Sequence, residues 1–162
     1  MVRAQDVNAR KDVRYRPTMD DRTVEASEPG SVGGAPRVYP AREVTKPWGS
    51  ELVFAELDGV YVGKVLRVRA GESLSLQVHS EKTETICVIA GQAQVDYGTD
   101  SSSLESTRLT SGDTIHLPAG ALHRITAVED LVFAEVSTAQ VGWQTDIVRL
   151  EDRYGRSGTS AP

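Results

Sequence analysis

From position 42 onward, apolar residues occur in short runs bounded by glycine, proline or polar turn residues. Short runs with turn signals between them are typical of strands, and Asp58-Gly59 is a two-residue hairpin signal. The expected strands are Val44–Trp48, Glu51–Leu57, Val60–Arg69, Gln92–Tyr97, Leu104–Leu109, Thr114–Leu117, Leu122–Ala127 and Leu131–Ser137. This pattern predicts an all-β protein built as a double-sheet jelly roll.

The two ends of the chain lack this pattern. Residues 1–40 mix opposite charges with a Gly/Pro-rich run and show no apolar period, so they predict a flexible N-terminal extension. An arm that clasps a partner subunit is the alternative. We expect a single domain over residues 41–156 and a flexible tail over residues 157–162.

The overall charge narrows the choice of partners. The net charge is −5, and because residues 1–40 are near balance, the domain itself carries about −6. An acidic domain is a poor nucleic-acid binder and must hold any anionic substrate through a few local cations. No apolar run approaches the roughly 18 residues that span a bilayer, and the N-terminus lacks the apolar core of a signal peptide. A soluble, cytoplasmic protein is expected.

One polar row interrupts the apolar pattern. Ser75, Gln77 and His79 share one face of a strand, whereas the alternate residues are apolar. Burying unpaired polar groups costs about 1–3 kcal/mol each, so this row needs partners or a ligand such as a metal ion.

Two glycine-bounded blocks contain this row and a second histidine. The first, from Gly71 to Gly91, reads G(x)5-Q-x-H-(x)4-E-(x)6-G, and the second, from Gly112 to His123, reads G(x)5-P-x-G-(x)2-H. They resemble the two motifs of the cupin superfamily, which implies a cupin double-stranded β-helix, or jelly-roll barrel. The implied metal ligands are Gln77, His79, Glu84 and His123.

The resemblance narrows to one group of cupins. Many cupins carry histidine at position 77, whereas glutamine is expected in the cupin domain of type II mannose-6-phosphate isomerases. Four further segments are similar to that domain: Lys46-Pro-Trp-Gly49, Tyr61-Val-Gly-Lys64, Ser75-Leu-Gln-Val-His79 and Ile147-Val-Arg-Leu-Glu-Asp-Arg-Tyr-Gly-Arg156.

The donor set suits a divalent ion. Imidazole nitrogen, carboxylate and amide oxygen together suit Zn²⁺, the first expectation, or Mn²⁺, Fe²⁺, Co²⁺ or Ni²⁺. Four protein ligands leave a position open for water or substrate. Buried core histidines with no ion are the alternative for His79 and His123, while His116 has the opposite parity to its apolar neighbours and reads as structural or exposed.

The isomerase resemblance implies aldose–ketose exchange of a sugar phosphate by a homodimer. Lys64 and Glu135 lie on apolar rows and are the candidates for acid–base catalysis. A lysine at a sheet edge and a glutamate at a strand end are their structural alternatives. Lys82, Arg149 and Arg156 are the candidates for the phosphate, or else solvated surface charges.

Several positions depart from the isomerase pattern. Lys82 stands where arginine is usual, and Thr85-Ile86 stands where histidine-tryptophan is usual. Ala127, Ser137 and Thr145 also differ from the residues usual in this group. We therefore keep two alternatives from other classes, a metal-dependent cupin dioxygenase and a non-catalytic sugar-binding cupin. The nucleotidyltransferase domain of the bifunctional enzymes is absent from the 162 residues, so no sugar-nucleotide synthesis is expected.

Overall fold

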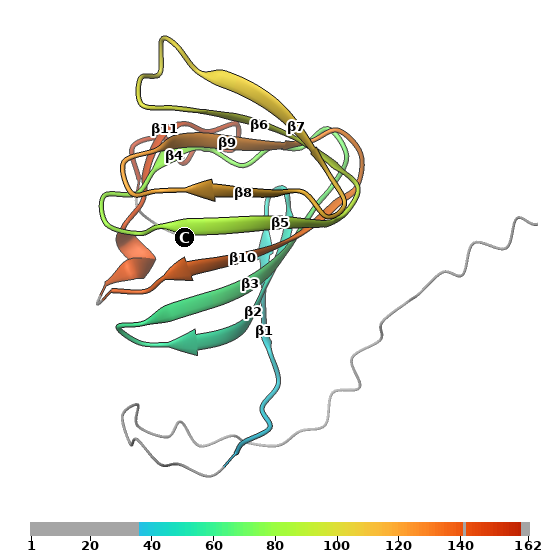
Figure 1. Ribbon diagram of the computed structural model, residues 1–162, viewed down its shortest axis with the longest axis vertical. Coiled ribbons are helices and arrows are strands. Elements are labelled where there is room, and N and C mark those ends of the chain that lie inside the picture. Colours follow the sequence, from blue (N-terminus) through green and yellow to red (C-terminus); the bar gives the residue numbers. More distant parts are fainter. Residues whose placement is uncertain (1–35, 141, 160–162) are drawn as a thin grey trace, which may run out of the picture.

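The computed structural model describes residues 36–140 and 142–159, so nearly all of the predicted N-terminal extension lies outside the described residues. Within this part the regular elements are strands, apart from one short 3-10 helix, η1 (Figure 1). The elements are β1 (Arg42–Lys46), β2 (Gly49–Leu57), β3 (Tyr61–Val68), β4 (Leu76–Val78), β5 (Glu84–Ala90), β6 (Gln92–Gly98), β7 (Glu105–Thr110), β8 (Thr114–Leu117), β9 (Leu122–Ala127), β10 (Leu131–Thr138), η1 (Trp143–Thr145) and β11 (Val148–Glu151).

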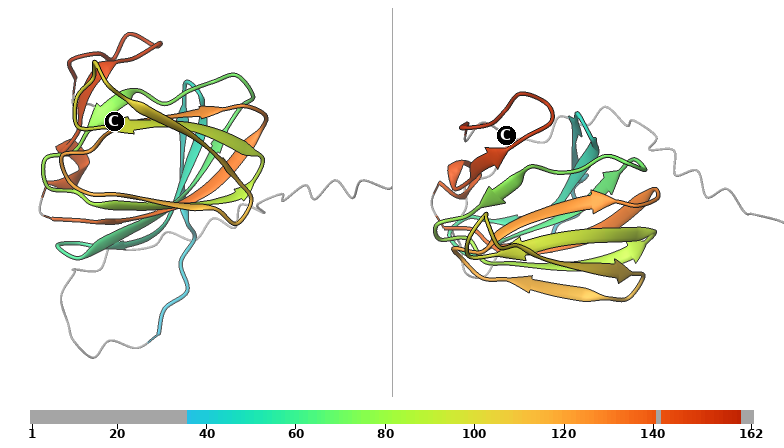
Figure 2. Two further views of the ribbon diagram at one scale, coloured as in Figure 1. Left: turned by 45° about the horizontal axis from the view of Figure 1, so that its top comes forward. Right: turned by 90° about the horizontal axis from the view of Figure 1, so that it is seen from above.

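The strands form two antiparallel sheets. One has the order β1-β2-β3-β10-β5-β8 and the other β11-β4-β9-β6-β7, so strands distant in sequence become neighbours. The two sheets face each other as the layers of a barrel (Figure 2). The predicted all-β jelly roll is confirmed. No helix in the described ranges is long and apolar enough to cross a membrane.

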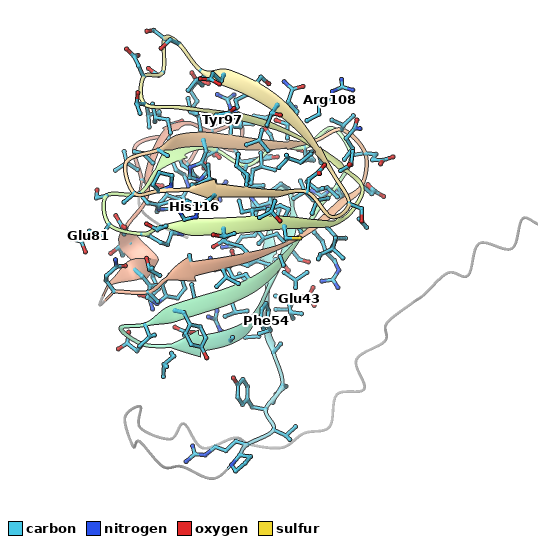
Figure 3. The ribbon with its side chains drawn as sticks, in the orientation of Figure 1. Glu43, Phe54, Glu81, Tyr97, Arg108 and His116 are labelled. Carbon is cyan, nitrogen blue, oxygen red and sulfur yellow. The ribbon has the colours of Figure 1, made fainter. Side chains whose placement is uncertain are left out.

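The core lies between the two sheets and is filled by alternate residues of each strand. Phe133 and Val88 enter it from the first sheet, and Val95 and Ile125 from the second; each is at most 2% exposed. Each such side chain stabilises the fold by about 1.5–3 kcal/mol through apolar burial. Away from the core, Phe54 and His116, labelled in Figure 3, are exposed on β2 and β8.

Glycine turns make two of the strand connections, β2 to β3 and β5 to β6. The predicted Asp58-Gly59 hairpin joins β2 to β3, with Gly59 at φ 75° and Leu57 paired to Tyr61. Gly91 ends the first motif at φ 84°, and a Cβ there would lie 2.2 Å from the Asp130 carbonyl oxygen. Only glycine fits this close approach between β5 and the strand that follows Asp130.

The C-terminal segment packs back on the barrel. It forms both η1 and β11, and β11 pairs with β4 so that Arg149 lies opposite Gln77. Trp143 and Tyr154 supply the packing, whereas Val148 and Leu150 are 52% and 40% exposed. At residues 157–159, Gly158 N–H donates to the Arg149 carbonyl, which orders the start of the expected tail.

Candidate metal centre and its cavity

The two motifs converge on one buried point. Gln77 on β4 pairs with His123 on β9, His79 follows β4 directly, and Glu84 begins β5 in the opposite sheet. His79, Glu84 and His123 are each 3% exposed. Thus the barrel brings together three groups that are spread between positions 79 and 123 of the sequence.

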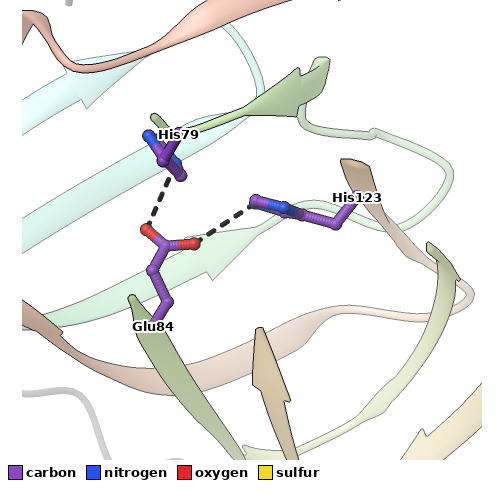
Figure 4. A group of neighbouring side chains, drawn as sticks. All are labelled: His79, Glu84 and His123. Atoms are coloured by element: carbon purple, nitrogen blue, oxygen red, sulfur yellow. Dashed lines mark ion pairs between the residues drawn. The ribbon is translucent and has the colours of Figure 1, made fainter. Parts of the chain in front are cut away.

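Glu84 bridges the two imidazoles (Figure 4). Its Oε1 lies 3.4 Å from His79 Nε2 and its Oε2 lies 3.2 Å from His123 Nε2. One ligand atom from each of the three residues lies within 4.8 Å of the others. This spacing lets one ion contact all three residues.

Hydrogen bonds to the backbone fix which ring nitrogen faces the cluster. His123 Nδ1 donates to the Ala121 carbonyl at 3.0 Å, and His79 Nδ1 donates to the Asp146 carbonyl. Each Nε2 therefore faces Glu84, and the buried His79 Nε2 has no hydrogen-bond partner among the described residues. Burial lowers the pKa of His79 to about 4, so its imidazole is neutral at pH 7.

The protonation states suit a divalent cation. Although burial raises the pKa of Glu84, hydrogen bonding to His123 and the charge of Lys82 hold it well below its ordinary value. The imidazole nitrogens of two histidines and one carboxylate are a donor set for a transition-metal ion. The residues present thus fit the metal that the sequence predicts, without deciding which ion it is.

Gln77 adjoins this cluster in an orientation that differs from the prediction of an oxygen ligand. Its Nε2 lies 3.2 Å from His123 Nε2, while its Oε1 accepts a hydrogen bond from Ser75 Oγ at 2.8 Å. As a ligand, Gln77 must present Oε1 instead, which a half-turn of the amide achieves because Ser75 Oγ can also accept. Its role as a fourth ligand stays a prediction.

A cavity of about 250 Å³ opens beside the centre. Gln77, His79 and Glu84 form part of its wall, and so does the predicted polar residue Ser75. Its remaining walls come from β1–β3, from Lys82, from β10 and from the C-terminal segment; these residues are Arg42, Val44, Lys46, Trp48, Glu51, Lys64, Leu66, Leu74, Lys82, Glu135, Trp143, Gln144, Ile147, Arg149 and Arg156.

A row of alternating charges crosses this cavity. Lys64 Nζ lies 3.6 Å from Glu51 Oε2 and 3.7 Å from Glu135 Oε1, so of the two positions left open for Glu135 the structure has the inward one beside Lys64. Lys82 Nζ lies 4.0 Å from the same Glu135 oxygen and 2.5 Å from Glu84 Oε1. The row therefore links the acid–base candidates to the metal centre.

The two acid–base candidates differ in their charge states. Burial lowers the pKa of Lys64, but the charges of Glu135 and Glu51 outweigh it, so the net shift is upward. Burial raises the pKa of Glu135, and Lys64 opposes that shift only in part. Lys64 is thus a persistent cation, whereas Glu135 is the carboxyl group poised to exchange a proton.

A cationic group lines another part of the cavity. Burial lowers the pKa of Lys46, and the nearby charges of Lys64, Arg156 and Arg149 act in the same direction against that of Glu51. Arg149 is 6% exposed and donates from Nη1 to the Thr159 carbonyl at 3.0 Å, while Arg156 pairs with Asp152 at 2.8 Å. We call Lys46, Arg149 and Arg156 the cationic cluster.

The outcome for the remaining predicted residues is mixed. Lys82 also lines the cavity, but its direct partner is Glu84 rather than the cationic cluster. His116 is exposed, one of the two readings left open for it, and it hydrogen-bonds Thr85 Oγ1 at 3.0 Å. Of the positions that depart from the isomerase pattern, only Lys82 lines this cavity. The others do not: Thr85 is exposed, Ile86 and Ala127 lie in the core, Ser137 is buried and Thr145 belongs to η1.

Sequence reasoning missed three contributors to this site. Lys46 shares its strand face with Val44, and Glu51 shares its strand face with the buried Val53. Trp143 lies with its ring 5.2 Å from Lys64 Nζ, a cation–π contact. Parity along β1 and β2 is the signal that points to the first two.

Comparison with known proteins shows the family to which the chain belongs. Residues 36–152 match the family model described as "Mannose-6-phosphate isomerase C-terminal". The chain belongs to this family, and its fold is that of the cupins.

Several curated relatives match the same region. The chain is 34% identical over 119 residues to the mannose-1-phosphate guanylyltransferase ManC of Salmonella typhimurium, covering 71% of this chain and 23% of that protein. It is 34% identical over 121 residues to the alginate biosynthesis protein AlgA of Pseudomonas aeruginosa, covering 74% and 24%. This chain thus matches about a quarter of the length of these relatives.

Solved structures support the fold alone. CapF, crystallised with the inhibitor 3-isopropenyl-tropolone, superposes with a TM-score of 0.62 at 19% identity, covering 71% of this chain and 36% of that one. Oxalate decarboxylase from Bacillus subtilis superposes with a TM-score of 0.59 at 20% identity, covering 68% and 30%. At these identities the barrel is shared, and the chemistry has to be argued from the site.

Proposed function

We propose that this chain is a metal-dependent aldose–ketose isomerase that acts on a sugar phosphate of the mannose 6-phosphate type. One observation carries the proposal: buried polar atoms without hydrogen-bond partners gather around a single cavity. Within the described residues they include His79 Nε2, Glu135 Oε1, Trp143 Nε1 and Arg149 Nε, all from residues that line it. Each such atom costs about 1–3 kcal/mol when it is buried without a hydrogen-bond partner. Binding of a polar ligand in this cavity is therefore favoured.

The cationic cluster supports a phosphorylated substrate. The domain is acidic overall, yet Lys46, Arg149 and Arg156 line the cavity together. An arginine fork and an ammonium group suit a phosphate monoester. Arg149 also lies opposite Gln77 across β11 and β4, so a phosphate held there leaves the sugar within reach of the proposed metal ligands.

Glu135 is proposed as the base that moves the proton. In the forward direction its carboxylate takes the proton from C2 of the open-chain aldose and returns it to C1, while a hydroxyl proton passes from O2 to O1. Its raised pKa brings it nearer to the working pH than an ordinary carboxylate. The product is the ketose, and atoms and charge balance without any further reactant.

The neighbouring cations have distinct proposed roles. Lys64 stays protonated and stabilises the negative charge that develops on the sugar oxygens, with Glu51 and the Trp143 ring holding its ammonium in place. Lys82 holds the Glu84 carboxylate in its ionised form. An ion held by His79, Glu84 and His123, with Gln77 as a fourth donor, supplies polarisation of the sugar oxygens when bound.

The names of the relatives agree with a sugar phosphate as substrate class. They refer to mannose-1-phosphate guanylyl transfer and to alginate biosynthesis, but the matched region is about a quarter of each protein. We therefore assign to this chain the isomerase step alone.

The test is turnover of the metal-loaded protein. Mannose 6-phosphate and unphosphorylated mannose should be incubated in parallel and followed by NMR, with metal content and O₂ consumption measured in the same samples. The proposal expects fructose 6-phosphate from the first substrate, little product from the second, and no O₂ uptake. Failure to convert any aldose or ketose phosphate, with metal present, would refute it, and O₂ uptake would favour the dioxygenase alternative.

A further inference from the structure

Asp146 contacts residues around the proposed metal site with both its backbone carbonyl and its side-chain carboxylate. It follows η1 in the C-terminal segment, 67 residues beyond His79, and its backbone carbonyl accepts the hydrogen bond of His79 Nδ1. That bond holds the ring so that Nε2 faces Glu84. A residue that orients a metal-binding histidine in this way affects the metal strongly without touching it.

The side chain of Asp146 grips the loop that follows His79. Its Oδ1 accepts the N–H of Ser80 at 2.8 Å, and its Oδ2 accepts the N–H groups of Glu81 at 3.0 Å and Lys82 at 2.7 Å. Three consecutive backbone donors therefore converge on one carboxylate. Charge-assisted hydrogen bonds of this kind are about twice as strong as neutral ones.

Asp146 is itself held firmly. Its N–H donates to the Trp143 carbonyl at 3.2 Å, and the next N–H, of Ile147, donates to the Thr145 carbonyl at 2.9 Å. The short helix that anchors it also presents Trp143 to the cavity. A displacement of residue 146 would thus move the partner of His79 and the loop that carries Lys82 together.

We propose that Asp146 is a positioning residue of the metal centre, through which the C-terminal segment orients His79 with its carbonyl and fixes the Ser80–Lys82 backbone with its carboxylate. The proposal rests on the metal site of the proposed function. It adds that the segment after β10 is required to build that site, although it contributes none of the proposed ligands. The Asp146 carboxylate also positions Lys82, because it holds the Lys82 backbone N–H while the Lys82 ammonium pairs with Glu84.

The test compares Asp146→Ala and Asp146→Asn with the wild type and with Asp113→Ala as a matched control. Asp113 also accepts backbone and side-chain donors, from Thr110 N–H at 2.7 Å and Thr110 Oγ1 at 2.9 Å, but in a turn that does not line the cavity. The first readout is the ¹⁵N NMR signals of the histidine rings in metal-free protein near pH 7. The second is the dissociation constant of Zn²⁺ from competition with a chelator.

Asp146→Ala should change His79 from a single Nδ1–H tautomer to a mixture, leave His123 unchanged, and weaken Zn²⁺ binding by about 10–100-fold. Asp113→Ala should match the wild type in both readouts. Both variants keep the backbone carbonyl, which shifts once the carboxylate no longer holds the Ser80–Lys82 backbone. If Asp146→Ala does not fold, Asp146→Asn, which keeps one acceptor oxygen in its side chain, should show a smaller loss of affinity with the same selective change at His79.

Unchanged His79 signals and Zn²⁺ affinity in a folded Asp146 variant would overturn the proposal. Both readouts are taken without substrate, so they are independent of turnover. A wild type that binds Zn²⁺ but isomerises nothing would refute the proposed function and leave the role of Asp146 standing. The ring signals test that role even in the absence of any metal.

Discussion

Glu135 on β10 lies directly opposite Lys64 on β3, and the Lys64 ammonium lies 3.7 Å from the Glu135 carboxylate. Lys64 and Glu135 are only 8% and 6% exposed, so the two charges strongly influence each other. The pair divides the proposed acid–base work: a lysine with a raised pKa remains charged, whereas burial raises the pKa of Glu135 and makes it the group that exchanges a proton.

The first prediction concerns the pH dependence of turnover. Lys64 lowers the pKa of Glu135, so Lys64→Met should raise that pKa further. If ionised Glu135 is the base, activity falls as the pH drops through its pKa, and the acidic limb of the kcat/KM profile should shift to higher pH in the variant. Steady-state rates across the pH range measure this shift.

Glu135→Gln is the companion variant. It should lose at least about 100-fold in kcat, because general-base catalysis contributes roughly 10²–10⁴-fold, while metal content stays at the wild-type level. An unshifted acidic limb in Lys64→Met, or near-normal turnover in Glu135→Gln, would rule out Glu135 as the base.

The second prediction concerns the ligands. His79→Ala and His123→Ala should each lose most of the bound metal, because each removes one of the two imidazoles that lie beside the Glu84 carboxylate. His116→Ala is the control, since this exposed ring contacts Thr85 rather than the cluster. Metal analysis of the purified variants decides the point. Stoichiometric metal in both His79→Ala and His123→Ala would refute the site.

The third prediction concerns the phosphate. Lys46→Met removes one charge of the cationic cluster without breaking a buried pair, so the fold should survive. KM for the sugar phosphate should rise by about tenfold or more, corresponding to roughly 1.4 kcal/mol or more of binding free energy, with a smaller change in kcat. Arg108→Met, on β7 and outside the cavity, should leave KM unchanged. An unchanged KM in Lys46→Met would exclude this residue from phosphate binding.

The fourth prediction separates two glycines of the sequence motifs. Both have positive φ, but a Cβ at Gly91 would lie 2.2 Å from the Asp130 carbonyl oxygen, whereas a Cβ at Gly112 has no heavy atom within 4 Å. Gly112→Ala should therefore cost only about 1–2 kcal/mol of strain from the left-handed backbone. Gly91→Ala should cost clearly more, because backbone atoms must move. Chemical denaturation of both variants measures the difference, and equal losses would contradict the close contact.

Much of this molecule follows from local sequence. Motif spacing indicates His79, Glu84 and His123, and strand parity places Lys64 and Glu135 on the inner face. Local sequence carries this information because a strand repeats every two residues and the motif residues lie near glycine turns.

Other features depend on long-range pairing that no local pattern specifies. The hydrogen bond from His79 to Asp146 and the pairing of Arg149 with Gln77 exist only because the C-terminal segment returns to β4. The charge state of Lys64 likewise requires Glu51 and Glu135 from two neighbouring strands. The orientation of Gln77 depends on Ser75 and His123, and so it differed from the expected one.

Proton transfer by Glu135 is the central claim, and exchange with solvent tests it most directly. Metal-loaded protein should be incubated with mannose 6-phosphate in D₂O and the product analysed by NMR, beside Glu135→Gln loaded with the same metal. The account predicts fructose 6-phosphate that carries deuterium at C1 in the wild type, at a level below full exchange if the buried carboxyl is shielded from solvent, and neither product nor exchange in the variant. Deuterated product formed equally fast by Glu135→Gln, or no conversion by the metal-loaded wild type, would contradict it.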